Sequence, residues 1–119
     1  MSQATTFTPN FAQLKKALLD SGYEIRILPQ RTLERLSLDA PAEVKRHLQS
    51  EIYGLIMPDE NTIGLAEELS LEERSVTLLH EMIHLFKAEI DEEDVEELTL
   101  NIEQQLTPDQ SGFLKFLVA

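Results

Sequence analysis

Two histidines and a glutamate lie within the five-residue segment His80-Glu81-Met82-Ile83-His84. Positions four apart on an α-helix project only about 40° apart, because one turn takes 3.6 residues. The imidazoles of His80 and His84 would therefore point to one place, as two ligands of a metal ion must. Glu81 lies on the flank of the same face, where its carboxylate can accept a proton from metal-bound water. This HExxH pattern predicts a catalytic zinc site with Glu81 as the general base.

The surrounding residues predict that this segment is a buried helix. Ser70 and Glu73 have the spacing of a capping box, so the helix should begin at Leu71 and continue to Phe86. The segment is apolar on almost every side, which indicates a central position in the core. Histidines in a buried helix need polar partners, because an unpaired polar group in a core is costly. A bound metal would satisfy both rings, and hydrogen bonds to the backbone are the alternative.

A catalytic zinc site usually has three protein ligands and one water molecule. No histidine follows His84, so the pattern with a third, downstream histidine is excluded. The remaining histidine, His47, lies far upstream on an expected surface helix. The other candidate for the third ligand is a carboxylate from the acidic residues at the start of the next helix. Glu92 fits the inward face of that helix best, and Glu96, one turn later, fits next, either as a ligand or as a partner that orients a histidine.

Apolar spacing, caps and turn residues predict the elements of a single domain over residues 1–119. The expected elements are helices over 11–20, 41–50, 71–86 and 91–106 and strands over 23–28, 51–57 and 62–66. Residues 30–39 fit a short helical turn or a loop. The last two strands should form a hairpin. The predicted fold class is α+β, with a small antiparallel-containing sheet packed on the HExxH helix.

Composition narrows the classes of function. A formal net charge of -12 opposes binding to nucleic acid, whose affinity comes largely from Lys and Arg on phosphates. The absence of cysteine excludes disulfides and thiolate zinc sites. The first ten residues lack the features of a signal peptide, and no apolar run approaches membrane-spanning length. We expect a cytoplasmic protein that does not bind a membrane. The sequence does not indicate its oligomeric state.

The residues HEMIH, followed by EEDVEELT at the start of the next helix, resemble gluzincin metallopeptidases. The narrower resemblance is to the single-domain minigluzincins and the ImmA/IrrE-type metallopeptidases, and it covers roughly residues 52–106. It implies a minimal zincin-like fold and one zinc ion held by His80, His84 and Glu92. Glu96 falls where relatives often carry an Asp or Asn near a zinc histidine. The resemblance also implies that the C-terminal tail, 107–119, covers the cleft of a latent enzyme, whereas its apolar residues favour packing in the core.

The expected function is that of a zinc metalloendopeptidase, a hydrolase that acts on a peptide or protein substrate. Zinc would lower the pKa of its bound water and polarise the peptide carbonyl, while Glu81 passes the water's proton to the leaving amine. An extended substrate could pair with residues 62–66, expected as an edge strand. The alternatives are a latent or non-catalytic zinc-binding module that acts as a protein-interaction domain, and a helical interaction protein without metal.

Overall fold

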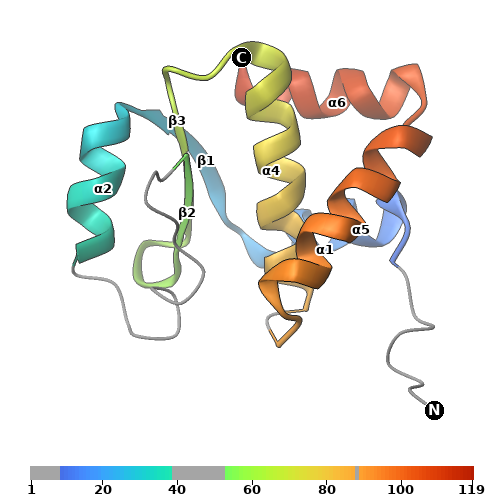
Figure 1. Cartoon of the computed structure of the whole chain (residues 1–119), viewed down its shortest axis with the longest axis horizontal. Coiled ribbons are helices and arrows are strands. Elements are labelled where there is room, and N and C mark those ends of the chain that lie inside the picture. Colours follow the sequence, from blue (N-terminus) through green and yellow to red (C-terminus); the bar gives the residue numbers. More distant parts are fainter. Residues whose placement is uncertain (1–8, 39–52, 88) are drawn as a thin grey trace.

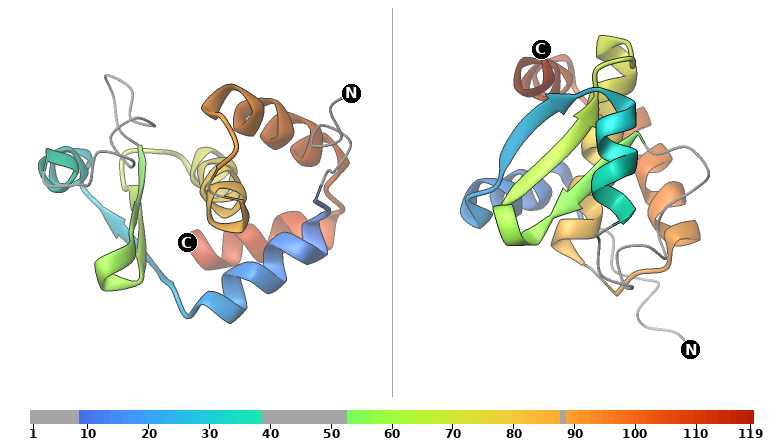
Figure 2. Two further views of the ribbon diagram at one scale, coloured as in Figure 1. Left: turned by 90° about the horizontal axis from the view of Figure 1, so that it is seen from below. Right: turned by 90° about the vertical axis from the view of Figure 1, so that its left-hand side faces the viewer.

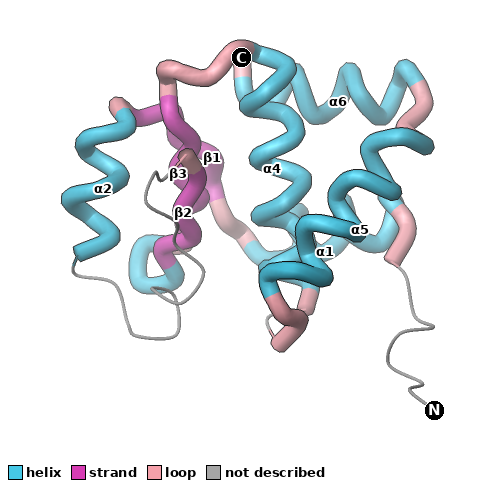
Figure 3. Tube along the Cα trace, in the orientation of Figure 1, coloured by secondary structure: helices cyan, strands magenta, loops and turns pink. Residues whose placement is uncertain are grey.

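A three-stranded sheet lies among five α-helices in the computed structural model, which describes residues 9–38, 53–87 and 89–119 (Figure 1). The elements in chain order are α1 (Phe11–Ser21), β1 (Glu24–Leu28), α2 (Gln30–Leu38), β2 (Gly54–Met57), the 3₁₀ turn η2 (Pro58–Glu60), β3 (Thr62–Ala66), α4 (Leu71–Phe86), α5 (Glu92–Gln105) and α6 (Pro108–Val118). Figure 3 shows the same elements coloured by type. The predicted α+β class is confirmed, and the ambiguous segment after β1 is a helix.

β3 is the central strand of the sheet, whose order is β1-β3-β2. The predicted hairpin of β2 and β3 is antiparallel, as expected. The prediction of β3 as an edge strand is wrong, because β1 pairs with its other side. That pairing is parallel, so the sheet is mixed. All five residues of β3 are buried, which suits a strand with neighbours on both sides and helices on both faces.

Helices cover the two faces of the sheet in separate layers. α2 lies on one face, and α4 lies on the other with α1 and α6 beside it (Figure 2). The alternation along β3 matches this arrangement, since Ile63 and Leu65 belong to the main core with α4. A smaller apolar cluster around Leu33 of α2 and Leu55 of β2 fills the opposite side. The sheet thus lies between α2 and the layer of helices that includes α4, which carries the HExxH residues.

α4 begins and ends where the sequence predicts. Ser70 Oγ accepts a hydrogen bond from the Glu73 backbone N–H, and the Glu73 carboxylate accepts one from the Ser70 N–H, which completes the predicted capping box. Leu79, Met82 and Ile83 are fully buried. Because core packing holds α4 on several sides, the backbone that carries His80 and His84 has a fixed place in the fold.

The terminal segment forms a helix, α6, that packs against α4 and lies beside α1. Thr107 caps it by accepting a hydrogen bond from the Gln110 N–H. Leu114 and Val118 are buried in the main core, and the ring of Phe113 meets that of Phe11 edge to face with centroids 6.1 Å apart. The apolar residues of this segment therefore contribute to the core.

Some expectations fall on residues outside the described ranges. These are the predicted helix over 41–50, which includes His47, and the first two residues of the predicted strand over 51–57. Among the helices that the structure describes, none has both the length and the apolar character needed to cross a membrane.

Candidate metal centre

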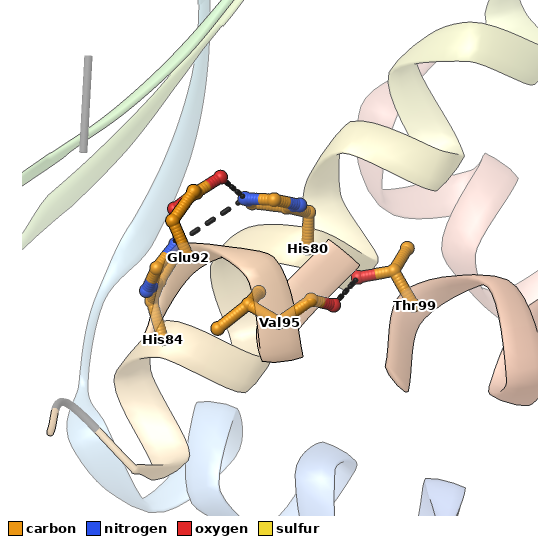
Figure 4. A network of polar contacts seen from close by, with 5 residues as sticks. All are labelled: His80, His84, Glu92, Val95 and Thr99. Carbon is orange, nitrogen blue, oxygen red and sulfur yellow. Dashed lines mark hydrogen bonds and ion pairs between the residues drawn. The ribbon is translucent and has the colours of Figure 1, made fainter. Parts of the chain in front are cut away.

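Glu92 lies on the inward face of α5, next to the histidines of α4. Val95, Thr99 and Ile102 are the buried residues of α5, and they repeat at the three- and four-residue spacing of one helical face. Glu92 lies one turn before Val95 on this face, at the first position of the helix. Packing of α5 on α4 therefore brings the Glu92 carboxylate against the two imidazoles (Figure 4).

Three side chains converge on one point. The Nε2 atoms of His80 and His84 are 3.2 Å apart. Oε2 of Glu92 lies 2.8 Å from His80 Nε2, and Oε1 lies 2.8 Å from His84 Nε2. One ligand atom from each of the three residues lies within 4.8 Å of the others. This His-His-Glu group has the composition and the closeness to bind a metal ion.

The spacing of the two histidine nitrogens fits a small tetrahedral cation, whereas the 2.8 Å contacts of Glu92 are hydrogen-bond distances that would lengthen around an ion. Zinc binds nitrogen and carboxylate oxygen at about 2.0–2.1 Å, so the ligand atoms of a regular tetrahedron lie about 3.3 Å apart. The 3.2 Å between the histidine nitrogens is close to that value. In the metal-free site the Glu92 carboxylate contacts both Nε2 atoms directly. A cation would take the place of these contacts, and two imidazole nitrogens with a carboxylate oxygen are donors that fit it.

The structure distinguishes between the two glutamates that the sequence left open. Glu92 is half-buried beside the histidines, whereas Glu96 is exposed and lies outside the His-His-Glu group. Glu96 follows Glu92 by four residues, so it lies about 6 Å farther along the axis of α5. α5 begins beside the C-terminal end of α4 and ends away from it (Figure 1), so Glu92 is the nearer of the two to the histidines.

Glu81 lies between α4 and the start of β2. Its Oε2 would be 3.0 Å from a Cβ atom built on Gly54, so the carboxylate lies close to the strand's backbone. Burial raises the pKa of the Glu81 carboxyl to about 8, and the negative charge of Glu92 adds to the rise. Gly54 is a neighbour of the site that the sequence motifs did not predict. A glycine inside a strand, which often marks a close approach, was the available signal.

The centre is accessible from one side. The side chains of His80 and Glu92 are 21% and 22% exposed, whereas that of His84 is 9% exposed. A surface hollow of about 670 Å³ lies along α4 one turn before His80 and Glu81. Tyr53 and Thr77 are among the residues that line it. The hollow lies next to the centre along α4 but is not lined by the histidines or by Glu92.

The raised pKa of Glu81 predicts a pH-dependent stability of the metal-free protein. Burial moves the pKa from 4.5 to about 8, so the folded protein keeps a proton that the unfolded chain loses. The stabilisation is complete below pH 4.5 and is lost as the pH rises toward 8. Urea unfolding of metal-free wild type and Glu81→Gln should show the wild type alone losing this stability. Parallel pH profiles of the two proteins would contradict the expectation.

Comparisons of the chain with family models, with curated proteins and with solved structures give no match. The residues and their geometry are thus the basis for assigning a function.

Proposed function

We propose that this protein is a zinc-dependent metallopeptidase that hydrolyses peptide bonds. The observation that carries the proposal is the convergence of His80, His84 and Glu92 on one point. Glu81 directly follows His80 on the same helix, α4. Two imidazoles and a carboxylate are a ligand set that zinc uses in catalytic sites with an open fourth position. The resemblance of HEMIH and its following helix to gluzincins supports the same assignment.

Each protein group has a distinct part in the proposed reaction. When bound, zinc would supply a Lewis acid that polarises the peptide carbonyl and lowers the pKa of a water molecule. His80, His84 and Glu92 would hold the ion, and the burial of His84 would keep one side of the centre closed to solvent. Glu81 would accept the proton of the attacking water and deliver it to the leaving amine nitrogen.

The acid–base properties of Glu81 suit this part. Its pKa of about 8 in the metal-free site lies close to physiological pH, where both protonation states can form. A nearby dication would favour the carboxylate, which is the form that accepts a proton. The same group would then be protonated at the stage when the leaving amine requires a proton.

We expect an extended peptide to pass these groups along β2. Of the described strands, β2 is an edge strand that packs on α4, and its first residue lies against Glu81. We expect substrate backbone to pair with β2, since the central position of β3 leaves it no open side. The hollow along α4 would receive side chains on one side of the cleaved bond.

Metal removal and restoration test the proposal. Wild-type protein would be stripped with a chelator and assayed on an unstructured fluorogenic peptide before and after one equivalent of zinc. Hydrolysis should disappear without metal and return with zinc, because the ion and Glu81 must act together. Protein that binds zinc but cleaves no unstructured peptide would favour a non-catalytic zinc-binding module instead.

A further inference from the structure

The first residue of β2 lies unusually close to α4. A Cβ atom at Gly54 would lie 2.8 Å from Thr77 Cγ2, 3.0 Å from Glu81 Oε2 and 3.4 Å from Glu81 Cγ. The backbone of Gly54 does not itself require glycine, since Gly22 is the described glycine with a positive φ. The requirement at Gly54 is therefore one of space, and two side chains of α4 occupy that space.

Neither Thr77 nor the backbone of Gly54 can move freely away from the other. The Thr77 hydroxyl donates a hydrogen bond of 2.9 Å to the Glu73 carbonyl, and this fixes the direction of the Thr77 methyl group. The backbone of Gly54 is held by its pairing with Leu65 of the central strand, and Leu65 is fully buried. α4 is likewise held by the main core. A Cβ added at Gly54 would press on both side chains, and of the two the Glu81 carboxylate can rotate away most easily.

We propose that Gly54 is a positioning residue for the general base. Its bare backbone forms the wall against which the Glu81 carboxylate rests, and this wall sets how far the carboxylate extends along α4. The inference rests on the proposed peptidase function and adds a residue outside the HExxH helix and the metal ligands. Catalytic groups must be held to within about 0.5 Å, and a misplacement of about 1 Å can cost about 10²-fold in rate.

The Gly54→Ala variant tests this role, with Gly64→Ala as a matched control. A Cβ at Gly64 would also clash, at 2.7 Å from Leu33 Cδ2, but it faces α2 on the other side of the sheet. We expect Gly54→Ala to lower kcat by about 10- to 100-fold with KM and zinc content unchanged. Gly64→Ala should lower the melting temperature without a comparable loss of kcat.

A double variant keeps the test valid where Gly54→Ala folds poorly. Thr77→Ser removes the methyl group of the 2.8 Å contact and leaves the contact with Glu81 Oε2. Gly54→Ala/Thr77→Ser should therefore regain melting temperature while kcat stays low. If Gly54 were merely structural, melting temperature and kcat would recover together, and that result would overturn the inference.

The melting temperature, measured on both zinc-loaded and metal-free protein, tests the contact between Gly54 and Glu81 without an assay of activity. Gly54→Ala should lower the melting temperature less in a Glu81→Ala background than in wild type, because one of its two clashes is gone. Equal losses in both backgrounds would show that Gly54 and Glu81 do not interact. An active wild type with unchanged kcat in Gly54→Ala would overturn this inference alone, whereas an inactive wild type would overturn the proposed function as well.

Discussion

The Glu81→Gln variant is expected to lose peptide hydrolysis by roughly 10²- to 10⁴-fold in kcat, the usual contribution of a general base. Glutamine has nearly the same shape as glutamate but cannot accept a proton at neutral pH. Glu81 lies outside the His-His-Glu group, so zinc content should remain near one ion per chain. The loss should appear in kcat, because proton transfer belongs to the reaction step and not to substrate binding.

A matched control for this variant is Glu93→Gln, which makes the same chemical change at an exposed position of α5. Its kcat and zinc content should equal those of wild type. Both variants would be measured by steady-state kinetics and by metal analysis on the same preparations. Hydrolysis that survives in Glu81→Gln at the wild-type rate would exclude Glu81 as the base.

The Glu92→Gln variant is expected to bind zinc more than about 100-fold more weakly than wild type. Loss of a group that only supports a metal ligand already costs about 10- to 100-fold in affinity, and Glu92 contacts both histidine nitrogens directly. The amide carries no charge to neutralise a dication. Competition with a chromogenic zinc chelator would measure the two affinities.

Glu96→Gln provides the control on the same helix. Glu96 is exposed and lies outside the His-His-Glu group, so this variant should keep the affinity of wild type. An equal loss in both variants would indicate that general negative charge on α5 attracts the ion. A loss confined to Glu96→Gln would show that Glu96, and not Glu92, is the zinc ligand.

The parts of the site that lie on single helices could be predicted from sequence. The spacing of His80 and His84 depends only on the helical repeat, and the capping box from Ser70 to Glu73 is likewise a local pattern. The choice between Glu92 and Glu96 could not be settled this way. It depends on how α5 crosses α4, which is a matter of tertiary packing.

The order of strands was less predictable because it depends on contacts between distant segments. The hairpin of β2 and β3 is local and was predicted, whereas the parallel pairing of β1 with β3 spans more than one intervening element. The sequence TIGLA has no charged residue, which favours a central strand over the edge position expected for it. The contact of Gly54 with Glu81 joins β2 to α4 and likewise has no local signal beyond the glycine itself.

Anomalous diffraction at the zinc absorption edge, from crystals of the zinc-loaded protein, directly tests the claim that His80, His84 and Glu92 bind zinc. One peak per chain is expected within about 2.1 Å of His80 Nε2, His84 Nε2 and a Glu92 carboxylate oxygen. The Glu81 carboxylate should lie beside the open side of that peak and not coordinate it. A zinc-loaded crystal without a peak at these three residues would contradict the claim.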